Sequence, residues 1–339
     1  MIISFLFLFA GLAIILLAAE FFTNGIEEFG RYFSFSQAVV GSIFAAVGTA
    51  LPETILPLVA IFMYGGASAK EIGVGAILGA PFMLSTLAFF LVGLTVTVAS
   101  MKGRRRFEMY VEMHSVRRDI TFFLAMYCAA IAIPLLGGMA TLIPVSVLLV
   151  LGYFYYAYLT FKGESSGLEH SEGMYLWRLF CRFGNKQTGN HPPLIIILLQ
   201  VLASLAVMVK GAHTFVKSLE QISLSFGMDP LLFALLLAPV ATELPEKFNS
   251  VTWTWKGRDT LALGNITGAM VFQSTFPVTV GLTCTEWHIT GMALFSAALA
   301  IISSAVVLCS VSIMKRISPY ALLFGGLLYL VYILVLLLA

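Results

Sequence analysis

The tripeptide Leu-Pro-Glu occurs twice, at residues 51–53 and 244–246, and each copy lies inside an apolar segment. A carboxylate within a membrane span is energetically costly and usually serves a function. The proline beside it lacks an amide hydrogen and breaks the helix, which frees backbone carbonyls. Two such sites in matching positions of two halves indicate an ion site at the interface between repeats.

Oxygen ligands for a cation can be assembled around these glutamates. Glu53 and Glu246 supply two negative charges, which match a divalent ion. Ca²⁺ takes about six to eight oxygen ligands, preferably from carboxylates and carbonyls. Thr49 and Thr242 each precede a glutamate by four residues, so we expect them on its helical face. The pattern is therefore suited to a divalent cation held by oxygen ligands.

A third carboxylate, Glu243, lies three residues before Glu246, so both can point into one cavity. Two carboxylates that close do not readily both ionise without a cation, which favours a proton-coupled site. The alternative is an ion pair from Glu243 to Lys247 or Lys210. A buried acid paired with a lysine is also the alternative for Glu53 and Glu246, but the symmetry of the two motifs argues against it.

The composition is that of a polytopic membrane protein. Of the 339 residues, 60% are hydrophobic and 11% are charged, whereas soluble domains carry about 25% charged residues. The net charge of +2 gives no reason to expect a nucleic-acid partner, so the expected partners are the lipid bilayer and the transported cations. Four cysteines stand singly, without the spacing of a metal site or a disulfide framework.

Ten segments are long and apolar enough to cross a bilayer, which takes about 20 residues. They are 2–20, 37–63, 71–99, 120–137, 140–161, 193–219, 229–254, 259–285, 288–311 and 318–338. We therefore predict an all-α membrane protein with ten transmembrane helices. The first segment lacks a basic leader, so we interpret it as a span rather than a cleaved signal peptide.

The basic residues predict the orientation. With the N-terminus outside, 15 of the 19 lysines and arginines fall in inner loops. This distribution follows the positive-inside rule and supports an outside N-terminus, with the plasma (cytoplasmic) membrane as the expected location. The basic loop at residues 102–119 is explained by contact with phospholipid headgroups.

The two halves of the chain form a repeat. Residues 19–53 align without a gap on residues 212–246. Because each half holds five spans, the second copy must run through the membrane in the opposite direction. We predict a first five-helix repeat at residues 1–161, a cytoplasmic linker at 162–192 and a second, inverted five-helix repeat at 193–339.

Glycines follow the motif in both halves at a spacing of four residues, at Gly75 and Gly79 and again at Gly264 and Gly268. Small residues at this spacing predict close helix contacts in both repeats. In the linker, residues 174–183 predict either a helix on the inner membrane surface or an ordinary polar connection with a short helix.

With Gly-Thr-Ala-Leu-Pro-Glu at residues 48–53, Ala-Thr-Glu-Leu-Pro-Glu at 241–246 and a glycine-rich helix after each, the chain resembles the sodium/calcium exchanger family. The resemblance implies that Glu53 and Glu246 face each other at mid-membrane and bind Ca²⁺ or Na⁺ alternately. It implies a secondary active cation antiporter that exchanges Ca²⁺ or a related cation for H⁺ or Na⁺ by alternating access. No enzyme activity and no cofactor are expected.

The chain departs from the family pattern where Na⁺ ligands are expected. The usual hydroxyl residue after the threonine is Ala50 in the first motif and Glu243 in the second. The polar side chain expected in the following helix is Leu84 in the first half and Gln273 in the second, so Gln273 is a candidate ligand. We therefore expect H⁺ rather than Na⁺ as the counter-ion.

Two other functions compete with antiport. One is a degenerate homologue that binds cations without transporting them, which the apolar residues Ala80, Leu84 and Ala269 favour. The other is an intramembrane enzyme that uses paired carboxylates. The sequence has no HExxH, GxGD or GxSxG signature, which argues against the enzyme.

Overall fold

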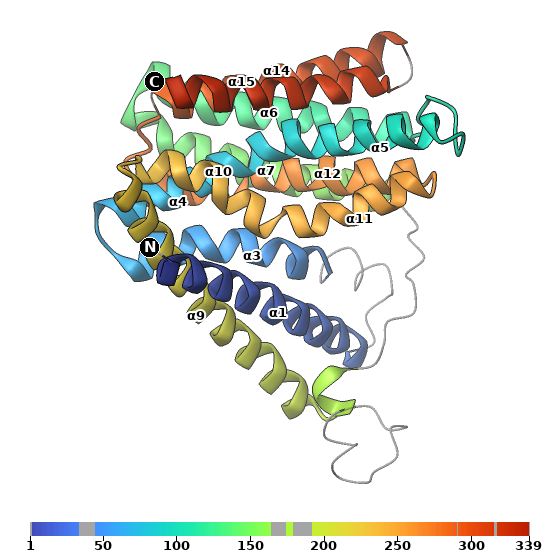
Figure 1. The fold of residues 1–339 in the computed structure, drawn as a ribbon. Coiled ribbons are helices and arrows are strands. Elements are labelled where there is room, and N and C mark those ends of the chain that lie inside the picture. Colours follow the sequence, from blue (N-terminus) through green and yellow to red (C-terminus); the bar gives the residue numbers. More distant parts are fainter. Residues whose placement is uncertain are drawn as a thin grey trace.

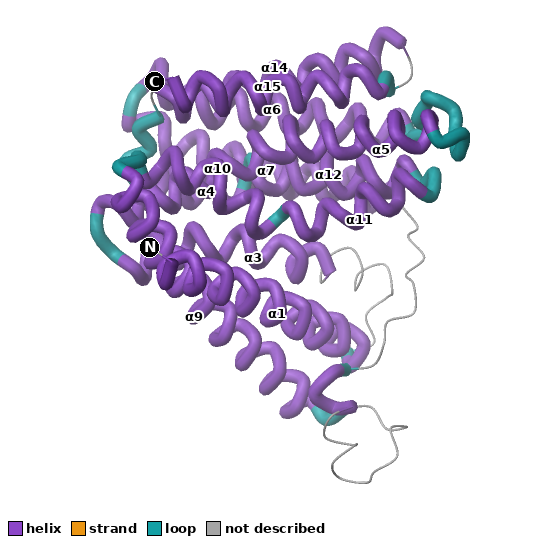
Figure 2. Tube along the Cα trace, in the orientation of Figure 1, coloured by secondary structure: helices purple, strands orange, loops and turns teal. Residues whose placement is uncertain are grey.

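The computed structural model describes residues 2–33, 45–163, 174–178, 192–289, 291–314 and 317–338, without the side chains of 45–49, 161–163, 244–246 and 314. These parts of the chain are helical and contain no strand (Figure 2). Seven of their helices are long and apolar enough to cross a membrane. The all-α membrane class is thereby confirmed, whereas the ten spans and the inverted repeat stay predictions.

The first half consists of helices that continue through short π-helical turns. They are α1 (Ile2–Tyr32), α3 (Ala45–Val59) with the turn η2 (Ala60–Tyr64), α4 (Ala67–Met83) with the turn η3 (Leu84–Ala88), α5 (Phe89–Met101), α6 (Met113–Gly137), the 3₁₀ turn η4 (Met139–Thr141) and α7 (Leu142–Gly163). Helix α1 extends well beyond the predicted end at residue 20. Pro52 lies inside α3 without interrupting it.

The second half contains two interrupted helices. Its elements are α9 (Leu194–Phe226), α10 (Pro230–Thr242), α11 (Leu244–Trp255), α12 (Asp259–Gln273), α13 (Phe276–Cys284), α14 (Gly291–Met314) and α15 (Pro319–Leu338). The segment predicted as one span at 229–254 breaks at Glu243, since Pro245 has no amide hydrogen to continue the helix. The span predicted at 259–285 breaks after Gln273, where the hydroxyls of Ser274 and Thr275 donate to the Val271 carbonyl at 3.0 and 2.9 Å.

Helices α1 and α9 lie side by side and are inclined to the remaining helices, which run roughly parallel to one another (Figure 1). The two approach closely at Gly11, where a Cβ atom would lie 2.9 Å from the Phe215 nitrogen and 3.0 Å from the Gly211 oxygen. Together with α3 and α10 they share one apolar core, and α4–α7 and α12–α15 build a second one.

Among the described residues, the predicted glycine contacts are found in the first half. A Cβ atom at Gly75 or Gly79 of α4 would collide with the carbonyl oxygens of Leu231 and Leu235 in α10. In α12, no heavy atom among the described residues lies within 4 Å of a Cβ placed at Gly264, and at Gly268 the nearest is 3.9 Å away. The prediction of close contact therefore stays a prediction for α12, because the residues that match Leu231 and Leu235 in the first half, 38 and 42, lie outside the described part.

This asymmetry predicts unequal effects of the same substitution. Gly79→Ala should lower the thermal stability of the purified protein, since forcing a methyl group against the α10 backbone costs about 1–3 kcal/mol. Gly264→Ala adds the same methyl group where the described residues leave space, so the melting temperature should change little. Thermal unfolding in detergent compares the two variants, and equal losses would contradict the difference in packing.

The basic loop after α5 is attached to the second half of the chain. Arg105 donates to both carboxylate oxygens of Asp259, from Nη1 to Oδ1 at 2.8 Å and from Nη2 to Oδ2 at 2.6 Å. The cations of Lys102 and Arg104 lie 5.6 and 5.1 Å from the centre of the Trp255 ring. Phospholipid contact alone thus does not explain this loop, which also joins α5 to the turn between α11 and α12.

The described part of the linker, residues 174–178, binds to α1 and α9. The Tyr175 amide donates to Asn24 Oδ1 at 2.9 Å, and the Leu176 amide donates to Gln200 Oε1 at 3.1 Å. Gln200, which is buried, also donates to the Phe21 carbonyl at 2.8 Å. A helical turn at residues 175–178 fits the short helix predicted here, whereas residues 179–183 lie outside the described part.

Candidate functional site

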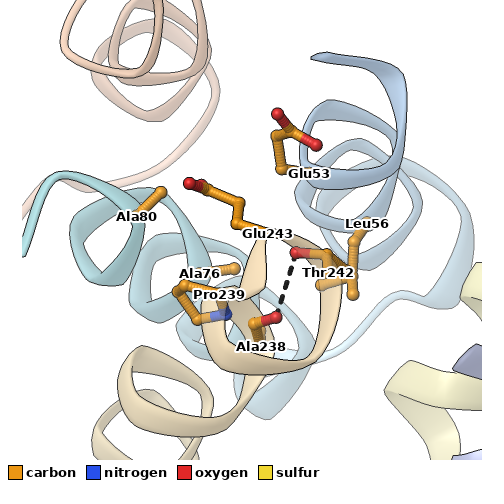
Figure 3. A pocket seen from close by; sticks show the side chains of 8 residues that line it. All are labelled: Glu53, Leu56, Ala76, Ala80, Ala238, Pro239, Thr242 and Glu243. Atoms are coloured by element: carbon orange, nitrogen blue, oxygen red, sulfur yellow. Dashed lines mark hydrogen bonds between the residues drawn. The ribbon is translucent and has the colours of Figure 1, made fainter. Parts of the chain in front are cut away.

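A small pocket lies where α3, α4 and α10 meet, beside the break that precedes α11. Its free volume is about 10 Å³, room for one water-sized particle, and it is lined by Glu53, Leu56, Ala76, Ala80, Ala238, Pro239, Thr242 and Glu243 (Figure 3). A space of this size is too small for a metabolite. The size and the two carboxylates therefore suit a cation rather than an organic substrate.

Two carboxylates reach the pocket from different halves of the chain. Glu53 projects from α3 and is half-buried. Glu243 lies at the break between α10 and α11 and is fully buried, and its side chain extends toward Ala80 on α4 (Figure 3). The structure thus brings together the predicted residue Glu53 and the third carboxylate, Glu243, around one space.

Thr242 adds a neutral oxygen to the same pocket. Its side chain is 2% exposed, and its hydroxyl donates to the Ala238 carbonyl at 3.0 Å, as the dashed line in Figure 3 shows. Because the hydroxyl hydrogen points back along α10, the lone pairs of Oγ1 remain available to a cation. Helix α10 also ends at Thr242, and the partial negative charge of a helix C-terminus favours a bound cation.

The lysine alternative for Glu243 remains open beside the pocket position. Lys247 is buried one turn away, and its amide donates to the Glu243 carbonyl at 3.1 Å. However, no salt bridge within 4.0 Å joins Glu243 to Lys247 or Lys210 among the described side chains. Lys210 is exposed on α9. Glu243 lines the pocket, and its part in cation binding stays a prediction.

Of three other predicted ligands, the structure describes the side chain of one. Thr49 and Glu246 lie in α3 and α11, but their side chains are outside the described part, so their positions stay predictions. Helix α10 ends at Thr242 and α11 begins at Leu244, so the expectation that Thr242 and Glu246 share a helical face stays a prediction. Gln273 ends α12 with 1% of its surface exposed, and its Nε2 has no hydrogen-bond partner among the described residues.

Sequence reasoning missed the wall of the pocket. Ala76 and Ala80 line it from α4, one turn apart, next to the glycines that bring α4 against α10. Pro239 lines it one turn before Glu243. The local signals were the small residues at four-residue spacing and the second proline upstream of the break.

Comparison with known families agrees with the helical membrane fold. The model of the family described as sodium/calcium exchanger protein matches residues 3–162 and 196–339. These ranges include most of the chain, and the protein belongs to the sodium/calcium exchanger family.

Similar proteins include CaxA of Alkalimonas amylolytica, which is 24% identical over 300 residues that cover 83% of this chain and 81% of that protein. The inner membrane protein YrbG of Escherichia coli is 22% identical over 275 residues, 80% of this chain and 77% of YrbG. The identities are low, but the matches extend over most of each chain.

Two solved structures share the fold. The H⁺/Ca²⁺ exchanger CAX superposes with a TM-score of 0.71 at 16% identity, covering 98% of this chain and 82% of that chain. The sodium-calcium exchanger NCX_Mj, soaked with Na⁺ and Sr²⁺, gives a TM-score of 0.57 at 19% identity, covering 98% of each chain. At these identities the likeness shows a common fold.

Proposed function

We propose that this protein is a secondary active antiporter that exchanges Ca²⁺, or a related cation, for H⁺ across the membrane by alternating access. The observation that carries the proposal is the pocket in which Glu53 and Glu243, from opposite halves of the chain, line one cation-sized space. Membership of the sodium/calcium exchanger family supports cation exchange. The two solved structures are named as exchangers of Ca²⁺ with H⁺ and of sodium with calcium.

The cation site proposed here combines charged and neutral oxygens. Glu53 and Glu243 neutralise a divalent ion, and the Thr242 hydroxyl supplies a further ligand. We propose that Glu246 and Thr49 complete this set from α11 and α3, with Gln273 at the end of α12. Ca²⁺ accepts such a mixed set of oxygen ligands.

The lining of the pocket supports H⁺ as the counter-ion. Ala80 presents a methyl group in the pocket, so α4 offers no side-chain oxygen there to a weakly held Na⁺. Glu243 instead adds a carboxylate close to Glu53. When Ca²⁺ leaves, two neighbouring carboxylates in a buried space repel each other, and a proton relieves that repulsion.

Flux measurements with purified protein in vesicles test the counter-ion. A pH gradient imposed without any Na⁺ should drive Ca²⁺ uptake, and a Na⁺ gradient at equal pH should drive little. Protein-free vesicles control for leakage. Uptake that requires a Na⁺ gradient and ignores pH would contradict proton coupling.

The second candidate function is cation binding without transport, which the loss of oxygens at Ala80, Leu84 and Ala269 favours. It predicts Ca²⁺ binding to the purified protein with no flux under either gradient.

For the transporter, we propose residence in the plasma membrane with the N-terminus outside.

A further inference from the structure

A second buried carboxylate, Asp119, lies outside the pocket, near the start of α6. It is 3% exposed and accepts hydrogen bonds from three helices. Thr267 in α12 donates to Oδ2 at 2.7 Å, and Tyr156 in α7 donates to Oδ1 at 3.1 Å. Arg118 in α6 also donates to Oδ1, at 3.1 and 3.2 Å. The carboxylate therefore joins α6, α7 and α12 inside the protein.

The same network holds α12 at Thr267, with the Tyr156 hydroxyl close to the next residue. Thr267 is fully buried and bonds to Asp119, while the Tyr156 hydroxyl lies 3.9 Å from the place of a Cβ at Gly268. A buried carboxylate that loses a hydrogen-bond partner is costly, so these bonds resist both rotation and sliding of α12. Apolar packing joins the same helices, as where the Phe272 ring lies 5.7 Å from the Tyr153 ring, but among the described side chains the hydrogen bond that fixes the middle of α12 to α6 is that of Thr267.

The attachment point is close to the proposed cation ligand Gln273. Residues 267–273 belong to one uninterrupted helix, and α12 ends directly at Gln273. A rotation of α12 at Thr267 would therefore turn Gln273 by the same angle. Because Gln273 is 1% exposed, even a small rotation would change what its amide reaches.

We propose that Asp119 is a positioning residue for cation binding: through Thr267 and Tyr156 it fixes α12 so that Gln273 faces the cation site. The proposal rests on the proposed function, because it takes Gln273 as a cation ligand. It assigns a role in ion affinity to a carboxylate that does not touch the ion.

The test uses variants of Thr267 and measures ⁴⁵Ca²⁺ binding to the purified full-length protein. Thr267→Val keeps the shape of the side chain but removes the donor to Asp119. It should raise the half-saturating Ca²⁺ concentration by about tenfold, as expected for a hydrogen bond to a charged group. Thr267→Ser retains the hydroxyl and should bind nearly as the unaltered protein does.

A matched control separates positioning from general destabilisation. Thr254 is equally buried, but its hydroxyl donates to the Ser250 carbonyl of its own helix at 2.8 Å. Thr254→Val should leave the half-saturating concentration unchanged. If Thr254→Val raised it as much as Thr267→Val, or if Thr267→Val did not raise it, the proposal would be overturned.

A double-mutant cycle provides the decisive readout. Gln273→Leu introduces the residue found at the matching position of the first half, Leu84, and removes the proposed ligand. In this background Thr267→Val should cause no further loss of affinity, since α12 has no ligand left to position. Additive losses would overturn the proposal, and Tyr156→Phe replaces Thr267→Val in the cycle if the latter fails to fold.

The result is separable from the proposed function. If the protein binds Ca²⁺ but vesicles show no flux, antiport is wrong while the binding series still tests Asp119. If flux occurs and the cycle is additive, antiport stands and the role of Asp119 is wrong.

Discussion

Glu53→Gln is expected to abolish cation exchange and leave the fold intact. The substitution keeps the size of the side chain but removes one of the negative charges that line the pocket with Glu243. A divalent cation in a poorly solvated pocket depends on those charges more than it would in water. We expect the initial rate of ⁴⁵Ca²⁺ uptake into vesicles to fall by at least about 100-fold, equivalent to roughly 2.7 kcal/mol.

The same uptake measurement provides the control. Glu71→Gln makes the identical chemical change at an exposed residue of α4 and should transport at the normal rate. Glu246→Gln should fail as Glu53→Gln does, because the sequence repeat places it in the equivalent position. A Glu53→Gln protein that exchanges Ca²⁺ normally would rule out this pocket as the cation site.

Glu243→Gln should separate proton coupling from cation exchange. An amide cannot carry the proton that replaces Ca²⁺, so uptake driven by a pH gradient should fall about tenfold or more. Exchange of ⁴⁵Ca²⁺ for unlabelled Ca²⁺ includes no protonation step, so at a concentration that saturates the weakened site it should fall less, through the loss of one cation ligand alone. The two rates are measured in the same vesicle preparation.

The ratio of these two rates decides the role of Glu243. Thr242→Val serves as the comparison, because it removes a neutral ligand from the same pocket and should lower both rates in proportion. Equal losses in Glu243→Gln would make Glu243 a cation ligand that carries no proton.

The membrane class and most helices follow from apolar composition and segment length, but the breaks do not. The same Leu-Pro-Glu tripeptide lies within a continuous α3 at Pro52 and directly follows the break at Glu243 in the second half. A proline removes one hydrogen bond in either place. Whether the helix then kinks or stops depends on what the neighbouring helices supply, which the local sequence does not contain.

The candidate site was predictable for the residues within the repeated motif. Glu53, Thr242 and Glu243 were all predicted, and all three line the pocket. Contacts between distant segments were not predictable, because nothing in the pattern around Asp119 indicates Thr267, 148 positions away. The glycine spacing likewise does not tell which helix a glycine contacts. Gly79 meets the backbone of α10, whereas no described backbone lies against Gly264.

Residues 174–178 fasten the connection between the two halves to both of them. A cut in the chain between residues 179 and 191 would leave residues 174–178 on the same polypeptide as α1 and α7. The hydrogen bond from the Leu176 amide to Gln200 in α9 would survive the cut. The two fragments would thus remain connected by hydrogen bonds at residues 174–178. The halves could therefore be supplied as two polypeptides that assemble there.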